Sequence, residues 1–333
     1  MVRRIFFTSA VVLPLLIILA SIWWPILLLL FLLVGPYIAV GVYDVLQKKH
    51  ALLRVYPVIG HGRYLMELVR PEIQQYFVES NINGTPFSRE FRSVVYQRAK
   101  GELDTRPFGT QRDVNRVGYE WMNHSMNPVP SSEEETRVRI GGADCTKPYL
   151  SSHLNISAMS FGSLSKTAIL ALSRGAKSGG FAHNTGEGGI SPYHLEGGGD
   201  LIWQIGTAYF GCRSPEGDFD ERLFVENAQR DQVKMIEIKI SQGAKPSHGG
   251  ILPGRKVSVE IAHTRGVPVG EDVISPPTHS TFSNPKGLLE FVARLRELSG
   301  GKPVGFKLCI GYRSEFLGIC KAMVATGIHP DFI

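Results

Sequence analysis

The sequence lacks a CxxC pair and any other close grouping of cysteines. Its four cysteines lie far apart, at Cys145, Cys212, Cys309 and Cys320. This excludes a thiol-based zinc site and a disulfide framework, and indicates reduced thiols in a cytosolic body. Long basic runs interleaved with aromatic residues are missing and the net charge is only +6, so we expect no nucleic-acid partner. The GxSxG, HExxH and dinucleotide-binding patterns are absent, so we expect no metal site and no nicotinamide site on this chain.

No charged residue occurs between Arg4 and Asp44. That run is about twice the length of one membrane span, which needs about 20 apolar residues. The Trp-Trp-Pro sequence at 23–25 suits a membrane interface followed by a new helix. We therefore expect residues 1–44 to form a hairpin of two spans, at about 5–22 and 25–43. Basic residues flank both ends, which places both ends, and with them the rest of the chain, in the cytoplasm. A cleaved signal peptide is the alternative, although its apolar region would be shorter.

Residues 45–150 are polar and mixed, and we expect a helical lead-in subdomain that ends in a linker. Two stretches have apolar residues at helical spacing, 71–81 and 88–103, and Ser88 suits the N-cap of the second. A run rich in Pro, Ser and Glu at 127–140 is typical of a linker that leads into a short strand. No motif in this part of the chain indicates chemistry.

From residue 151 to 333, short apolar runs alternate with segments of helical spacing. The expected strands are LNISAMS, GGFAHN, KMIEIKI, DVISPP, PVGFKLCI and HPDFI. The expected helices are KTAILALSRGAKSG, KVSVEIAHTRG, PKGLLEFVARLRELSGG and SEFLGICKAMVATG. This alternation predicts an α/β fold with a parallel sheet, and we expect a TIM-like (β/α)8 barrel that is incomplete at its C-terminus. Such barrels place their active sites at the carboxyl ends of the strands.

The loops at these strand ends supply backbone N–H groups, small hydroxyls and lysines, which suits an anionic cofactor such as a flavin or a phosphate ester. Lys307 stands in the apolar run VGFKLCI, where an unpaired buried ammonium would be costly. We interpret it as a cation beside a cofactor, or else as a lysine that reaches solvent. Arg265 either binds a carboxylate or favours the end of its helix, and Glu187 belongs either to the site or to the surface. The nearby histidines have no partner at ligand spacing and are interpreted as structural: His183, His194, His248 and His279.

Four long motifs occur in one order: ISAMSFGSLSK, HNTGEGG, KISQGAKPSHGGILPGRKV and VISPPTHS. They closely resemble the FMN-binding synthase domain of glutamate synthases, over about residues 140–333, and the whole chain resembles a membrane-anchored branch of that family. The resemblance implies a barrel that reduces 2-iminoglutarate, formed from 2-oxoglutarate and ammonia, to glutamate through FMN. By motif it implies flavin contacts from Ala158, Met159, Ser160, Thr185, Gln242 and Lys307. It also implies contacts on the 2-oxoglutarate side from Glu187, Lys245 and Arg265.

Three departures from the family pattern bear on this expectation. No glutaminase domain or leading cysteine nucleophile is present, so ammonia would come from solution or from another subunit. Ile251 stands where the synthases have glutamine in GGQLPG, which removes a polar contact on the oxo-acid side. The chain stops in what we count as the sixth strand, before the phosphate-binding loops of such barrels. It also stops before the cysteines that would bind an iron–sulfur cluster. We therefore expect a truncated chain that binds FMN weakly or not at all.

Two other functions stay open at this stage. One is an FMN barrel that acts on a different 2-oxo or 2-hydroxy acid, or that passes electrons to a membrane partner. The other is an inactive barrel that serves as a membrane scaffold. The partners expected under the first interpretation are a 2-oxoglutarate-like small molecule, the membrane, and a separate electron-donor reductase or ferredoxin.

Overall fold

The computed structural model describes residues 2–80, 82–102, 113–130, 132, 136–240 and 249–333. The chain divides into two compact units, residues 1–124 and residues 125–333. The second unit begins ahead of residue 151, where we expected the barrel domain to start. The domain boundaries expected from the sequence stay predictions.

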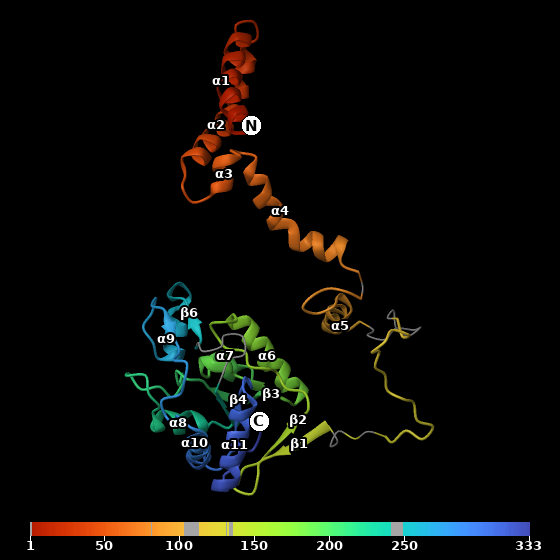
Figure 1. Cartoon of the computed structure of the whole chain (residues 1–333), viewed down its shortest axis with the longest axis vertical. Helices are drawn as coiled ribbons and strands as arrows, with labels where there is room; N and C mark the ends of the chain where they lie inside the picture. Colours follow the sequence, from red (N-terminus) through yellow and green to blue (C-terminus); the bar gives the residue numbers. More distant parts are fainter. Residues whose placement is uncertain (1, 81, 103–112, 131, 133–135, 241–248) are drawn as a thin grey trace. The chain divides into compact units, whose positions relative to one another are not determined.

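The first unit starts with two long apolar helices, drawn in red in Figure 1. Its first elements are α1 (Val2–Ser21), the 3-10 turn η1 (Pro25–Leu30) and α2 (Phe31–Leu46). Pro25 occupies the first position of the new turn, where its missing N–H costs no hydrogen bond. The segments expected as spans are therefore helical. Two helical stretches, Val2–Ser21 and Pro25–Leu46, are long and apolar enough to cross a membrane, a test that a signal sequence also passes.

Small and aromatic residues hold α1 against α2. Phe6 is buried against Gly41, where any added side chain would collide with the phenyl ring. The Phe6 ring meets the Tyr37 ring edge-on at a centroid distance of 5.5 Å. The Tyr37 hydroxyl lies 2.6 Å from the Oγ of Ser9. Many other apolar side chains of the hairpin are exposed, Leu32 by 73%, so its outer surface is apolar.

Helices continue through the rest of the first unit, as expected. They are α3 (Ala51–Val55), α4 (Gly60–Ile73), the π-helical turn η2 (Gln74–Val78) and α5 (Arg89–Lys100). The helix expected at 71–81 is the continuation of α4 into η2. The predicted cap of α5 is confirmed, because Ser88 Oγ accepts a hydrogen bond from the Phe91 N–H at 3.5 Å. Gly101 ends α5 in the left-handed conformation, with φ 70°.

The second unit contains a parallel sheet in the strand order β3-β4-β5-β8. The strands are β3 (Ala182–Asn184), β4 (Asp200–Ile205), β5 (Val233–Lys239) and β8 (Val304–Lys307). Ile156 adds a parallel bridge to His183 on one side. On the other side the N–H of Asp331 donates to the carbonyl of Val304 at 2.8 Å. The expected parallel α/β arrangement is confirmed. The described residues form an open series of strands, so the closed barrel stays a prediction.

The two faces of this sheet differ in polarity. One face carries fully buried apolar side chains, namely Leu201, Trp203, Ile205, Ile236, Ile238, Val304 and Phe306. Residues of α8 (Glu221–Ala228) and α10 (Pro285–Leu298) complete this core. Burying such a side chain contributes about 1.5–3 kcal/mol, which explains why these strands form. The opposite face carries polar side chains near the strand ends.

An antiparallel hairpin covers the amino-terminal half of the polar face. Its strands are β1 (Arg137–Ile140) and β2 (Tyr149–Ser152). Tyr149 packs against a small apolar cluster on the sheet, and its hydroxyl donates to Asp200 Oδ2 at 2.9 Å. Strand β1 is the short strand expected after the linker.

The expected helices of the second unit are confirmed. They are α6 (Lys166–Gly179), α9 (Val259–Arg265), α10 and α11 (Arg313–Thr326). Side-chain caps begin three of them, from Ser165, Ser258 and Asn284. Helix α8 and the short α7 (Pro192–Glu196) were not expected.

Several strand expectations need correction. The run LNISAMS forms only an isolated bridge at Ile156, and the run HPDFI contacts β8 through backbone hydrogen bonds without forming a strand. The run DLIWQI forms β4, in the interior of the sheet, although we had not predicted a strand there. The run DVISPP was expected as a strand of the parallel sheet, and this is wrong. Its residues form β7 (Val273–Ile274), which pairs antiparallel with β6 (Ile251–Leu252) outside that sheet. Pro276 and Pro277 lie beyond Ser275 and have no N–H that could extend this ladder further.

Candidate functional site

Polar groups gather where the parallel strands end, a region that we call the carboxyl edge. It consists of Ala158–Ser160, the turn η4 (Gly186–Gly188) after β3, Gly206–Thr207 after β4, Lys239 at the end of β5 and Lys307 at the end of β8. Parallel strands bring their carboxyl ends to one side of the sheet. Segments far apart in the sequence therefore meet here.

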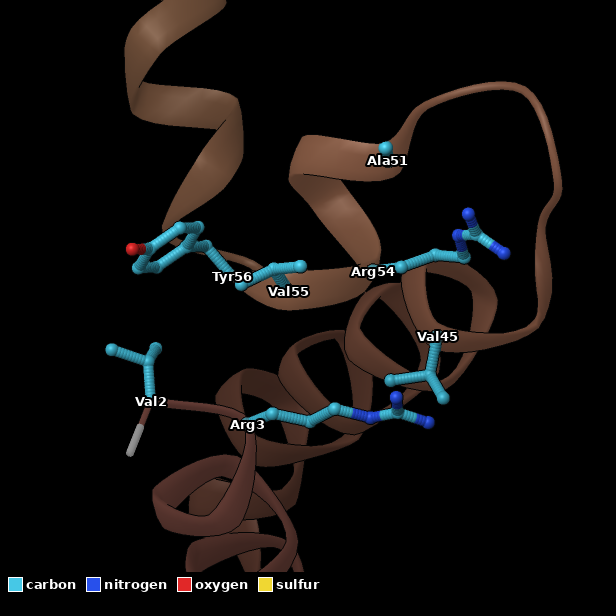
Figure 2. Close-up of a pocket in the computed structure, with 7 residues that line it drawn as sticks. All are labelled: Val2, Arg3, Val45, Ala51, Arg54, Val55 and Tyr56. Carbon is cyan, nitrogen blue, oxygen red and sulfur yellow. The ribbon is translucent and has the colours of Figure 1, made fainter.

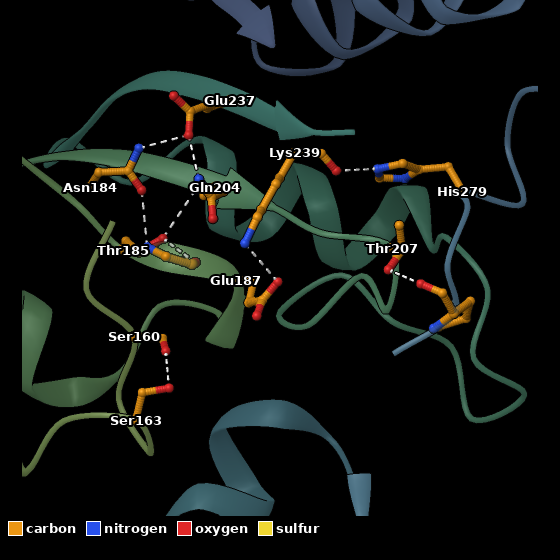
Figure 3. A network of polar contacts seen from close by, with 12 residues as sticks. Ser160, Ser163, Asn184, Thr185, Glu187, Gln204, Thr207, Glu237, Lys239 and His279 are labelled. Carbon is orange, nitrogen blue, oxygen red and sulfur yellow. Dashed lines mark hydrogen bonds and ion pairs between the residues drawn. The ribbon is translucent and has the colours of Figure 1, made fainter. Parts of the chain in front are cut away.

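A row of three polar side chains supports the carboxyl edge from within the sheet (Figure 3). Glu237 Oε1 accepts hydrogen bonds from Asn184 Nδ2 at 2.9 Å and from Gln204 Nε2. These residues belong to β5, β3 and β4, so one carboxylate links three adjacent strands. Sequence analysis missed this row. A carboxylate within the apolar strand VKMIEIK is the same kind of signal that drew attention to Lys307.

Lys239 forms an ion pair with Glu187, and Figure 3 shows its chain reaching from β5 to η4. The Nζ of Lys239 lies 3.1 Å from Glu187 Oε2, and both side chains are largely buried. Lys307 is the register partner of Lys239 on the neighbouring strand. Gly250 also lies against Glu187, because a Cβ on this glycine would come within 2.8 Å of Oε1. The carboxyl edge therefore holds a carboxylate and two ammonium groups, Lys307 being exposed.

The backbone of η4 is shaped by neighbours on both sides. Asn184 Oδ1 accepts from the Gly186 N–H at 3.0 Å, which begins the turn. Gly186 has φ 64°, and a Cβ there would lie 2.8 Å from the backbone nitrogen of Ser160. Only glycine combines this conformation with this close approach. The hydroxyl of Thr185 is fully buried, accepts from the Gln204 N–H at 3.1 Å and donates to the Gly186 carbonyl.

Arg265 reaches the carboxyl edge from the end of α9. It is 5% exposed, and its Nη2 donates to the carbonyl of Phe161 at 3.1 Å. The guanidinium lies 5.0 Å from the centroid of the Phe210 ring. Burial lowers the pKa of Arg265, while the nearby Glu187 acts in the opposite direction. Its Nε is buried and finds no hydrogen-bond partner within the part of the chain that the structure describes.

Tyr209 and His279 hold the segment after β7 against the end of β5. His279 Nε2 donates to the carbonyl of Lys239 at 2.8 Å, and the Tyr209 hydroxyl lies 3.2 Å from His279 Nδ1. Burial lowers the pKa of His279, so the neutral ring with a proton on Nε2 fits these contacts. Thr207 Oγ1 donates to the carbonyl of Pro276 at 2.6 Å. The SPP segment thus reaches the carboxyl edge without being a strand of the sheet.

The structure brings most of the predicted site residues to this edge. They are Ala158, Met159, Ser160, Thr185, Glu187, Arg265 and Lys307. Gln242, Lys245 and His248 lie outside the described residues. The roles assigned to all of them stay predictions. The structure adds residues that sequence analysis did not select: Asn184, Gln204, Glu237, Lys239 and Tyr209.

Comparison with known proteins places this site in a family. A family model described as the conserved region in glutamate synthase matches residues 120–333. The chain belongs to the glutamate synthase family. It is 37% identical over 333 aligned residues to the glutamate synthase large subunit-like protein YerD of Bacillus subtilis, an alignment that covers 88% of this chain and 63% of that protein.

Other relatives match over about half to two thirds of the chain. The archaeal-type glutamate synthase (NADPH) of Thermotoga maritima is 38% identical over 177 residues, which is 53% of this chain and 32% of that protein. The glutamate synthase large subunit-like protein of Rhizobium meliloti is 30% identical over 217 residues, 63% of this chain and 46% of that protein. This glutamate synthase family member therefore spans less than two thirds of the length of these relatives.

The carboxyl edge of this family member fits an anionic ligand that accepts hydrogen bonds. Lys239 and Lys307 stand in register at neighbouring strand ends. The buried Nε of Arg265 is a donor without a partner in the described ranges, and an unmet buried donor costs about 1–3 kcal/mol. The close glycine packing at Gly186 and Gly188 brings backbone rather than side chains to the Ser160 turn. The lysines and the unmet Arg265 donor favour a ligand with negative charge and acceptor atoms.

Proposed function

We propose that the chain is the flavin-binding part of a glutamate synthase-type oxidoreductase. It would reduce 2-iminoglutarate, formed from 2-oxoglutarate and ammonia, to glutamate. FMN, when bound, would supply the hydride for this reduction. The observation that carries the proposal is the meeting of the Ser160 turn, η4, Lys239 and Lys307 at one sheet edge, within the region that the family model matches.

Each residue at the edge has a proposed part. Ala158, Met159 and Ser160 line one side of the flavin with backbone groups, and Thr185 holds the turn beside it. Lys307 contributes positive charge at the pyrimidine edge of the ring, where it stabilises negative charge. Glu187 and Arg265 position the oxo acid. By family motif, Gln242 adds a contact to the flavin and Lys245 adds a contact to the oxo acid. Both residues belong to the segment between β5 and β6.

The electron donor is proposed to be a separate protein, a reductase or a ferredoxin. The sequence contains no dinucleotide-binding fingerprint, whereas the names of several relatives include NADPH. The two apolar helices are proposed to anchor the catalytic unit to the cytoplasmic face of a membrane. In support, basic residues flank both ends of the hairpin.

Flavin titration tests the cofactor and the role of Lys307 together. We expect Lys307→Gln to weaken FMN binding by roughly tenfold to a hundredfold, because hydrogen bonds to charged groups contribute about 1.5–3 kcal/mol. The matched control is Lys321→Gln, which removes an equal charge from the exposed surface of α11. The dissociation constant is measured from quenching of flavin fluorescence on the detergent-purified chain. Equal affinities for the two variants would contradict the assignment of Lys307.

The position of Ile251 favours a second candidate, an FMN oxidoreductase for a less polar 2-oxo or 2-hydroxy acid. Ile251 is 51% exposed and directly follows Gly250, which contacts Glu187. An apolar side chain therefore stands close to the proposed oxo-acid site. Reoxidation of the reduced flavin by a panel of oxo acids with ammonia separates the candidates. A preference for 2-oxoglutarate that increases in Ile251→Gln supports the glutamate synthase reaction, and a preference for apolar oxo acids supports the second.

A further inference from the structure

A cavity of about 500 Å³ lies at the open end of the helical hairpin, within the first unit. Figure 2 shows its walls, which come from the start of α1, the end of α2 and the helix α3 with the residues after it. The lining residues are Val2, Arg3, Val45, Ala51, Arg54, Val55 and Tyr56. The cavity is an open surface hollow, because most of its lining residues are exposed to solvent.

The charge of this cavity is entirely positive. Arg3 and Arg54 line it from two different helices, and no carboxylate is among the lining residues. In Figure 2 both guanidinium groups lie on the Val45 side of the cavity, one on each side of that residue. Neither arginine forms an ion pair with a carboxylate in the described part of the chain. The Arg3 guanidinium packs over the Phe7 ring at 5.8 Å. Two guanidinium groups that no carboxylate neutralises, beside one cavity, favour an anion, above all a phosphate.

Asp44, the acidic residue next to Val45 in the sequence, forms its hydrogen bonds outside the cavity. Asp44 is fully buried, and its Oδ2 accepts from the Val58 N–H at 2.8 Å. Its Oδ1 lies 2.8 Å from His61 Nε2. These contacts connect the end of α2 to the start of α4. They help to fix the cavity walls and leave the two arginines without a carboxylate in the cavity.

The location of the cavity decides which phosphate it suits. It stands at the end of two apolar helices whose outer side chains are exposed, with Leu32 and Leu46 each more than 70% exposed. Val2, Val45 and Val55 add apolar walls beside the arginines. In a bilayer, this is the depth at which lipid phosphates meet the first methylene groups. Free phosphate would contact only the arginines. A phospholipid would contact the arginines through its phosphate and the valines through its first methylene groups.

We propose that this cavity binds the phosphate of an anionic phospholipid headgroup in the leaflet that the hairpin enters. Basic pockets between membrane helices on the cytoplasmic side recognise such headgroups. The inference rests on the proposed membrane anchoring and is independent of the proposed redox chemistry. The bound lipid fixes the separation of α1 and α3 by bridging Arg3 and Arg54.

Native mass spectrometry of the full detergent-purified chain, titrated with phosphatidylglycerol or phosphatidylcholine, tests the proposal. We expect one phosphatidylglycerol to bind in preference to phosphatidylcholine, and Arg3→Gln combined with Arg54→Gln to weaken it at least tenfold. The matched control is Arg4→Gln combined with Lys49→Gln, which removes the same charge at the same end of the hairpin from outside the cavity. This control should change the affinity less than threefold.

A second variant separates loss of the cavity from loss of charge or of folding. Ala51→Trp fills the cavity and keeps both arginines, and we expect it to lower the phosphatidylglycerol affinity at least tenfold with the helical circular dichroism unchanged. Equal losses in the two double variants would overturn the proposal in favour of diffuse attraction. Equal binding of the two lipids would also overturn it, as would displacement of phosphatidylglycerol by millimolar inorganic phosphate.

The lipid inference and the proposed function fail in different ways. If the hairpin is no anchor, carbonate washing releases the wild-type chain from membranes. If the flavin assignment is wrong, FMN titration fails in a chain that still selects phosphatidylglycerol. The Arg3 and Arg54 variants should leave flavin titration unchanged, because neither residue belongs to the carboxyl edge.

Discussion

At the scale of single residues, Glu237 connects the interior of the sheet to its functional edge. Its carboxylate holds the amides of Asn184 and Gln204. Asn184 in turn accepts the Gly186 N–H that begins η4, the turn that carries Glu187. The Glu237 carboxylate within the sheet thereby helps to position the Glu187 carboxylate at the carboxyl edge. Glu237 is therefore a positioning residue in the proposed site.

Removing this carboxylate should affect both stability and the site. In Glu237→Ala two amide donors lose their acceptor, so we expect a loss of about 1–3 kcal/mol in the free energy of unfolding. We also expect weaker FMN binding, while Glu237→Gln, which keeps one acceptor oxygen, should recover part of both. Denaturant unfolding and flavin titration measure the two effects. Glu226→Ala, an exposed carboxylate on α8, is the control. If it matched Glu237→Ala in both measurements, the positioning role would be wrong.

At the scale of elements, β3 and α7 meet through two buried histidines. The rings of His183 and His194 are 5.1 Å apart between centroids. His194 Nδ1 accepts from the Ser191 N–H at 3.1 Å and its Nε2 donates to the Met159 carbonyl at 3.1 Å. These contacts require the neutral ring. Burial lowers the pKa of each histidine to about 4 from its ordinary value of 6.5.

The packing of these two elements should therefore weaken in acid. Above about pH 6.5 both rings are neutral in the folded and the unfolded chain. Between about pH 6.5 and 4 the unfolded chain takes up protons that the folded chain excludes. Stability should fall in this window by up to about 1.4 kcal/mol per pH unit for each histidine. Hydrogen exchange of β3 and β4 amides as a function of pH measures this loss.

A volume-conserving substitution identifies the titrating group. His183→Leu should leave stability at pH 8 within about 1.5 kcal/mol of the wild type, because the volumes are similar and no hydrogen bond of the described ring is lost. It should reduce the acid slope by roughly half, since one of two titrating rings is removed. The control is His263→Gln, at an exposed position of α9. An unchanged slope in His183→Leu would show that other groups cause the acid loss.

At the scale of the whole second unit, Asp331 joins segments from both ends. Its Oδ1 accepts from the Gly142 N–H at 2.7 Å, and its Oδ2 accepts from the Val304 N–H at 2.8 Å. Arg296 Nε donates to the same Oδ2 at 3.0 Å, and both charged side chains are almost fully buried. One carboxylate thus ties the β1–β2 hairpin, the edge strand β8 and helix α10 together.

Loss of this carboxylate should be among the most damaging substitutions in the unit. In Asp331→Ala the Arg296 charge stays buried without its main partner, which costs about 3–5 kcal/mol. Asp144 provides a matched control, because its Oδ2 lies 3.9 Å from Nη1 of the same arginine but its side chain is 70% exposed. Asp144→Ala should cost less than about 1 kcal/mol. Comparable midpoints of denaturant unfolding for the two variants would refute this account.

Much of the local structure could be predicted from the sequence. Ser88 marks its helix start, the helices around α6, α10 and α11 follow from apolar spacing, and Pro25 begins a new helical segment. The site segments around Glu187 and Lys307 were expected at strand ends and lie there, whereas Ser160 follows a run that forms only an isolated bridge at Ile156. These features depend on residues within about one turn or one strand of each other, so the local order of side chains determines them.

Only the tertiary structure decided the partners across the sheet. The run DLIWQI lies between β3 and β5, and the Val273–Ile274 part of DVISPP pairs with β6 outside that sheet. Arg265 donates a hydrogen bond to the Phe161 carbonyl, and Lys239 forms an ion pair with Glu187, which is 52 positions away in the chain. Such contacts depend on strand order and register, to which all the strands contribute. The sequence by itself determined which groups stand at strand ends, and the packing of the sheet determined which of them meet.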